Sequence, residues 1–172
     1  YELVSIPTNA NGIITKEDTE VIYYYKLKEP SVTNSINKTG TDMIITTNQE
    51  VNYTISYKAE AIDYIGEAEV TIVDNLPYAI DEAKSDLAGG TYNGEARTIT
   101  WTEKLASLNS YTNTGNVEIT KNIKVVYVGL DLEKANVIND VTGSIKLLNP
   151  EKTSNEVTAS WTTTTEFTMN IP

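Results

Sequence analysis

The sequence contains no cysteine and no histidine among its 172 residues. Without cysteine there is no disulfide to staple the fold, and no thiolate is available as a nucleophile or metal ligand. Without histidine, Ser-His-Asp and Cys-His catalytic systems and imidazole zinc sites are excluded. We therefore expect neither a conventional enzyme nor a metal site, and the sequence predicts no cofactor.

Basic side chains are also few. Lys and Arg number 13 against 24 Asp and Glu, which gives a net charge of −11, and the only arginine is Arg97. Because phosphate contacts need clustered Lys and Arg, this balance argues against a nucleic-acid partner. The sequence also lacks an apolar run of the roughly 18 residues that a membrane helix needs, so no membrane insertion is predicted in this segment.

The residues that are abundant are typical of β-strands. Tyr accounts for 11 residues, against two Trp and one Phe, and the strand-like runs are separated by turn signals about 8–12 residues apart. A helical turn is expected only within residues 79–87 and 130–136, because no window shows sustained helical periodicity. The sequence predicts an all-β protein: a short N-terminal β-hairpin segment (1–30), an Ig-like antiparallel β-sandwich (31–160), and a linker to a following domain (161–172).

The run Val70–Pro77 is the most informative strand of this sandwich. Its apolar residues fall on one face at a period of two, and Asn75 and Pro77 end it with turn chemistry. We expect a buried strand that brings Asp74 into the interior. A carboxylate placed there needs a partner.

Two polar residues in other expected strands are candidates for that partnership. Lys38 lies in the expected first strand, Ser35–Ile45, and Asn139 lies in a late strand expected over Val137–Leu148. The apolar alternation after Asn139 is typical of a buried strand, and we expect this strand to lie next to the first one.

Four segments of this region resemble the repeat domains of Gram-positive surface adhesins and pilins, which are Ig-like sandwiches of the collagen-adhesin type. They are Lys38, Val73-Asp74-Asn75-Leu76-Pro77, Thr98–Trp101 and Val137-Ile138-Asn139-Asp140-Val141-Thr142, and the resemblance covers about residues 31–148. Many such domains have an intramolecular isopeptide bond from a first-strand lysine to a last-strand asparagine, with a buried Asp or Glu between them. The resemblance implies a Lys38–Asn139 cross-link, Asp74 as the proton shuttle, and a structural stalk domain among neighbouring repeats at the cell wall, outside the cell.

The N-terminal segment shows a second resemblance. Tyr1–Val4, Pro7–Gly12 and Thr19–Tyr25 are similar to the C-terminal part of a mucin-binding-protein (MucBP) repeat. This implies host mucin, a glycan or an extracellular-matrix protein as a partner. A mucin- or glycan-binding module without a cross-link is accordingly the alternative function.

The chemistry of a cross-link also follows from the residue types. An amine attacks a carboxamide only when it is unprotonated, and burial lowers the pKa of a lysine such as Lys38. Burial raises the pKa of Asp74, so this acid can stay protonated, hydrogen-bond to the asparagine carbonyl and move protons as ammonia leaves. The chain would act on itself once, so the sequence predicts no enzyme beyond this single turnover.

Three alternatives stay open at this point. Asn155, just before the expected last strand Glu156–Trp161, is the rival partner of Lys38. Lys38 and Asp74 could form an ordinary buried ion pair, at a desolvation cost of several kcal/mol per ion. A plain Ig-like spacer without any cross-link would show the same pattern of strands.

Overall fold

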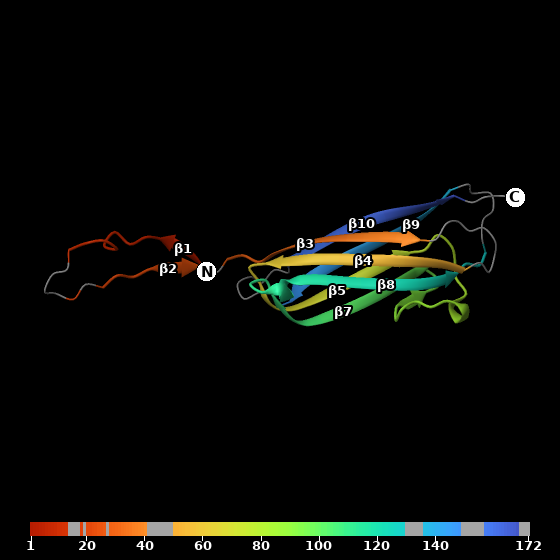
Figure 1. Cartoon of the computed structure of the whole chain (residues 1–172), viewed down its shortest axis with the longest axis horizontal. Coiled ribbons are helices and arrows are strands. Elements are labelled where there is room, and N and C mark those ends of the chain that lie inside the picture. Colours follow the sequence, from red (N-terminus) through yellow and green to blue (C-terminus); the bar gives the residue numbers. More distant parts are fainter. Residues whose placement is uncertain are drawn as a thin grey trace.

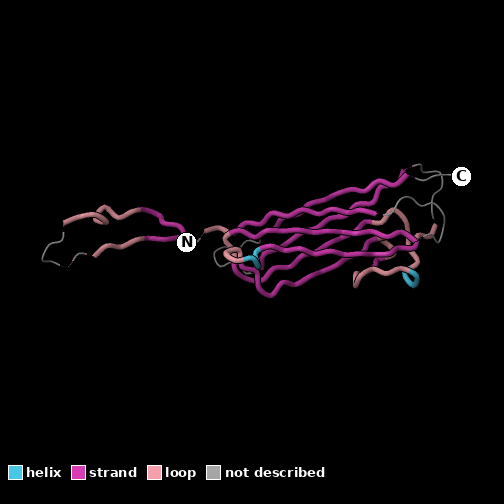
Figure 2. Tube along the Cα trace, viewed as in Figure 1, coloured by secondary structure: helices cyan, strands magenta, loops and turns pink. Residues whose placement is uncertain are grey.

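The structure is a computed structural model. It describes residues 1–13, 18, 20–26, 28–40, 50–129, 136–148 and 157–168. Within these residues the chain forms β-strands in three antiparallel sheets and two short 3₁₀ turns, with no α-helix (Figure 2). The described part of the chain therefore offers no helix long and apolar enough to cross a membrane. The all-β class expected from the sequence is confirmed.

The N-terminal hairpin is a two-stranded sheet of β1 (Glu2–Ser5) and β2 (Tyr24–Lys26). Every residue of both strands is exposed. In Figure 1 the hairpin lies beyond the end of the sandwich at which β3 begins. An isolated pair of strands buries little apolar surface, and none of the described residues of the hairpin belongs to the buried core of the sandwich.

Eight strands form the sandwich (Figure 1). One sheet has the order β3-β4-β8 and the other the order β10-β9-β5-β7-β6. The first contains β3 (Ser31–Gly40), β4 (Glu50–Ile62) and β8 (Asn116–Val126). The second contains β5 (Ile65–Asn75), β6 (Thr91–Asn93), β7 (Thr98–Asn109), β9 (Asn136–Leu148) and β10 (Val157–Thr168).

The 3₁₀ turns are η1 (Glu82–Lys84) and η2 (Asn113–Gly115). The first falls within the helical turn expected over residues 79–87, which is confirmed. The second was not expected. The other helical turn was expected over residues 130–136, and residues 130–135 lie outside the described residues.

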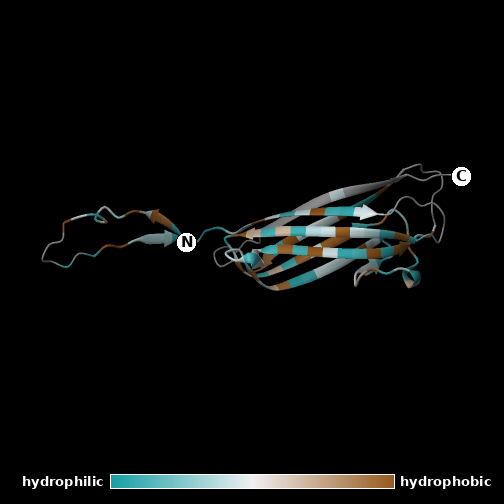
Figure 3. Cartoon of the chain, in the orientation of Figure 1, coloured by the Kyte–Doolittle hydropathy of each residue, from teal (hydrophilic) through white to brown (hydrophobic). Residues whose placement is uncertain are grey.

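Hydrophobic and hydrophilic residues alternate along the strands, as the colours in Figure 3 show. Buried and exposed residues alternate in the same way, so the core lies between the two sheets. In β4 the inward positions are all buried: Val51, Tyr53, Ile55, Tyr57, Ala59 and Ala61. In β5 the inward positions include Ala68, Val70 and Ile72, each fully buried. Burying one such large apolar side chain contributes about 1.5–3 kcal/mol, so the facing strands hold the two sheets together.

Two expectations need correction: the neighbours of the strand that contains Asn139, and the residue at which the sandwich ends. The strand that contains Asn139 contacts the first strand across the core but is not its hydrogen-bonded neighbour: β9 pairs with β5 and β10, whereas β3 belongs to the facing sheet. Apolar alternation fixes which face of a strand is buried but not which sheet the strand joins. The sandwich was also expected to end at residue 160. Instead β10 continues to Thr168, pairing with β9 along its whole length, so Asn139 lies in the penultimate strand.

Candidate functional site

Lys38 occupies an inward position of β3. Ile36 and Lys38 are buried while their neighbours in the strand are exposed, as the two-residue period of a strand requires. The Lys38 side chain is wholly inaccessible to solvent. Lysine is almost never fully buried without a partner, so this position needs an acceptor on the facing sheet.

The facing sheet supplies two acceptors, Asp74 from β5 and Asn139 from β9. Asp74 pairs with Val141 in the β5–β9 register, and Asn139 lies two residues before Val141 on the same face. The two polar side chains are therefore diagonal neighbours on the inner surface of one sheet. Both are fully buried, with no exposed surface.

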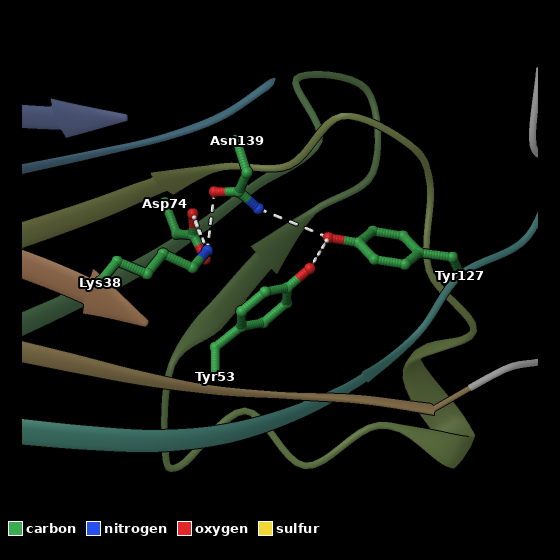
Figure 4. A network of polar contacts seen from close by, with 5 residues as sticks. All are labelled: Lys38, Tyr53, Asp74, Tyr127 and Asn139. Atoms are coloured by element: carbon green, nitrogen blue, oxygen red, sulfur yellow. Dashed lines mark hydrogen bonds and ion pairs between the residues drawn. The ribbon is translucent and has the colours of Figure 1, made fainter. Parts of the chain in front are cut away.

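The three residues meet at the lysine amino group (Figure 4). Lys38 Nζ lies 2.8 Å from Asp74 Oδ1 and 2.6 Å from Asp74 Oδ2. It also donates to Asn139 Oδ1 at 2.7 Å. The structure thus brings together the three residues that the sequence singled out from segments far apart in the chain. The rival, Asn155, lies outside the described residues.

Two tyrosines complete the cluster, and the sequence did not single them out. Tyr127 follows β8, and its hydroxyl accepts from Asn139 Nδ2 at 3.4 Å. The hydroxyls of Tyr127 and Tyr53 lie 3.0 Å apart, and the ring centroid of Tyr53 lies 4.1 Å from Lys38 Nζ. Alternation in β4 indicates that Tyr53 faces inward, but no local pattern indicates that it contacts Lys38.

Burial dominates the electrostatics of the cluster. It lowers the pKa of Lys38, although the nearby Asp74 opposes this. It raises the pKa of Asp74 against the opposing effect of Lys38, and Asp140 raises that pKa a little further. Both changes favour the uncharged forms. A proton that moves from Lys38 Nζ to an Asp74 oxygen produces both uncharged forms at once.

This arrangement has the components of an amide-forming reaction. A neutral amine has a lone pair for attack, and here it lies against the carboxamide of Asn139. A neutral acid beside the amine can donate and accept protons during the reaction. Holding the groups in place can itself lower a barrier by about 7–11 kcal/mol. An ordinary ion pair would need only Lys38 and Asp74 and does not explain the buried Asn139.

Comparison with known proteins identifies no family for this chain. No protein-family model matches the chain, and no curated protein is similar to it. Among the residues that the structure describes, no three His, Cys, Asp or Glu side chains are grouped so as to hold a metal ion. The buried cluster is therefore the feature from which a function is best inferred.

Proposed function

We propose that the chain is a structural stalk domain of a bacterial cell-surface adhesin that cross-links itself through an isopeptide bond between Lys38 and Asn139. The observation that supports this most is the contact of one buried amino group with both Asp74 and Asn139. The resemblance to surface adhesins and pilins adds the proposed location, outside the cell at the cell wall and among neighbouring repeats.

The proposed reaction begins with proton transfer from Lys38 Nζ to Asp74. The neutral amine then attacks Cγ of Asn139 while Asp74 donates its proton to Oδ1, where negative charge develops. Asp74 next takes a proton from the attacking nitrogen and delivers one to Nδ2. The Cγ–Nδ2 bond breaks, ammonia leaves, and the proton on Oδ1 returns to Asp74. The products are an amide, ammonia and the neutral acid.

The cross-link would replace the disulfide that a cysteine-free chain cannot form. Lys38 and Asn139 are 101 residues apart in sequence. Closing a loop of about 100 residues stabilises a fold by about 5 kcal/mol in the chain-entropy estimate. That is a large share of the 5–15 kcal/mol by which a domain is typically stable. A surface stalk exposed to proteases and changing conditions would benefit from it.

Intact mass spectrometry tests the proposal directly. The denatured wild-type chain should weigh one ammonia less than its sequence, and Asp74→Ala should restore the full mass. Fragmentation of a protease digest should join the peptide that contains Lys38 to the one that contains Asn139. A wild-type chain with its full mass would refute the cross-link. A peptide containing Lys38 joined to one containing Asn155 would show that Asn155, not Asn139, is the partner of Lys38.

A mucin- or glycan-binding module without a cross-link is the second candidate, because the hairpin exposes aromatic side chains. Tyr23, Tyr24 and Tyr25 are 45%, 63% and 59% exposed. Exposed tyrosine rings can stack on sugars. Glycan-array binding that disappears when residues 1–30 are deleted would support this function, whereas the cross-link requires no such dependence.

A further inference from the structure

The carboxamide of Asn139 has two chemically different ends, and the cluster distinguishes them. Oδ1 faces Lys38 Nζ at 2.7 Å. An ammonium group has only donors, so it can contact the oxygen of a carboxamide but not the NH₂ group. Nδ2 therefore points to the other side, where the Tyr127 hydroxyl lies.

The Tyr127 hydroxyl is suited to hold that NH₂ group. It accepts from Asn139 Nδ2, and the Tyr53 hydroxyl lies 3.0 Å from it as a second partner. Both rings are buried, and the Tyr127 ring packs edge-on against Tyr78 with centroids 6.1 Å apart. Burial raises the pKa of both tyrosines, so their hydroxyls stay neutral.

Tyr53 contacts both reacting residues, one directly and one through Tyr127. Its ring face lies against the Lys38 amino group, where a cation or its N–H groups are attracted to the aromatic face. Its hydroxyl reaches the hydroxyl that contacts Asn139. The nucleophile and the carboxamide are therefore held by one connected pair of aromatic side chains.

We propose that Tyr127, supported by Tyr53, is the positioning residue of the cross-linking reaction: its hydroxyl holds the Asn139 carboxamide with Oδ1 toward Lys38 and the leaving nitrogen turned away. This inference rests on the proposed function and adds a residue to it. In the opposite orientation Nδ2 would face the amine, and Oδ1 would lie away from the acid that has to protonate it. Fixing the orientation thus keeps the reacting atoms in a productive arrangement.

The sandwich contains a matched control for this contact. The Tyr57 hydroxyl accepts from Asn34 Nδ2 at 2.9 Å, which is again a tyrosine–carboxamide bond, here between the paired strands β3 and β4. Neither residue has a direct hydrogen bond to Lys38, Asp74 or Asn139 among the described contacts. Tyr57→Phe therefore removes a comparable bond from the core without touching the reacting groups.

The first test measures the rate of cross-linking in full-length chains. Newly synthesised wild-type, Tyr127→Phe and Tyr57→Phe chains are sampled over time, denatured and weighed for the loss of ammonia. We expect Tyr127→Phe to slow the reaction about five- to tenfold, as the loss of one buried hydrogen bond implies, and Tyr57→Phe to leave it within about twofold. Equal rates for Tyr127→Phe and wild type, or equal slowing by both variants, would overturn the inference.

The second test does not depend on the reaction. In Asp74→Ala chains, which are expected to stay unlinked, NMR hydrogen exchange of the side-chain NH₂ groups reports how each carboxamide is held. Adding Tyr127→Phe should speed exchange at Asn139 and leave Asn34 unchanged, and adding Tyr57→Phe should do the reverse. A Tyr127→Phe chain with unchanged exchange at Asn139 would overturn the positioning role. A wild type that never loses ammonia would instead refute the proposed function, while this exchange pattern still decides the role of Tyr127.

Discussion

Two polar contacts cross the interior of this sandwich from the same strand, and they differ in kind. At one end of β3, Asn34 donates to the Tyr57 hydroxyl and to the Gly143 carbonyl. Four residues further along, Lys38 meets Asp74 and Asn139. Both contacts satisfy a polar side chain on an inward position. Only the second contains groups that can exchange a proton and form a bond.

The comparison indicates what separates a structural hydrogen bond from a reactive site. The Asn34 contact is neutral, and burial raises the pKa of Tyr57 to about 12, so its hydroxyl stays protonated. In the Lys38 cluster burial acts on two ionisable groups in opposite directions and drives both toward neutrality. Burial therefore keeps the first contact neutral and favours the uncharged forms of Lys38 and Asp74 in the second.

Removing the acid should have the largest effect on stability. Asp74→Ala would prevent the proposed cross-link, for which loop closure predicts about 5 kcal/mol, and it would remove the carboxylate that pairs with the buried Lys38, at a further cost of about 3–5 kcal/mol. Urea denaturation followed by the fluorescence of the buried Trp101 measures the change.

The pH dependence identifies the cause of that loss. Because burial lowers the folded pKa of Lys38 below 10.5, the unfolded chain binds more protons between the two values, and stability rises with pH there. The deficit of Asp74→Ala should therefore shrink as pH rises toward 10.5. A deficit independent of pH would contradict the buried charge of Lys38 as its cause.

Removing the asparagine should have a smaller effect. Asn139→Ala would also prevent the proposed cross-link but would keep the Lys38–Asp74 ion pair, so the loss should be near the roughly 5 kcal/mol of loop closure. The exposed Asn122→Ala, on the outer face of β8, serves as the control and should change stability by about 0.5 kcal/mol or less. An Asn139→Ala protein as stable as wild type in urea would show that no cross-link contributes.

Low pH should slow the proposed cross-linking reaction, whereas the neutral hydrogen bonds of Asn34 should be unaffected. A proton added to the pair leaves Lys38 charged and Asp74 neutral, so no base remains to release the amine. Burial raises the pKa of Asp74 above 3.8, and the rate of ammonia loss should therefore fall as pH decreases through a midpoint above that value. A midpoint at or below 3.8 would argue against Asp74 as the proton acceptor.

Breaking the neutral contact should have the smallest effect. Asn34→Ala leaves the Tyr57 hydroxyl without the bond from Asn34, at a cost of about 1–3 kcal/mol. The chain should still lose one ammonia, because the reacting groups are untouched. A full-mass Asn34→Ala chain that is folded by circular dichroism would show that the two contacts depend on each other.

In β5 the sequence was sufficient to predict which side chains are buried. The two-residue period of β5 predicts that Asp74 faces inward with Val70 and Ile72, and all three are fully buried. Lys38 and Asn139 emerged because their segments resemble those of surface adhesins. Their meeting with Asp74 depends on how the sheets face each other, which alternation within a strand does not specify.

Tyr127 and Tyr53 also show that the sequence predicts burial better than it predicts contacts. Tyr127 continues the two-residue alternation of Ile123 and Val125 in the strand expected over residues 117–128, which indicates an inward side chain, and it is buried. No local pattern, however, indicates that its hydroxyl contacts Asn139. Tyr53 lies in a clear alternation, yet its contact with Lys38 comes from register: Lys38 pairs with Ile55, two residues from Tyr53 on the same face. Register between strands distant in sequence is a property of the whole fold.

The position of Asn139 within β9 decides how tension would pass through a cross-linked chain. A pull on the two ends would run from the N-terminal segment along β3 to Lys38, through the new amide to Asn139, and on toward β10. Residues 39–138 would carry none of it. The rest of β9 and all of β10 lie beyond the bond, so they would peel away first and extend the chain, and the bond would then stop the extension before β4, β5, β7 and β8 unfolded.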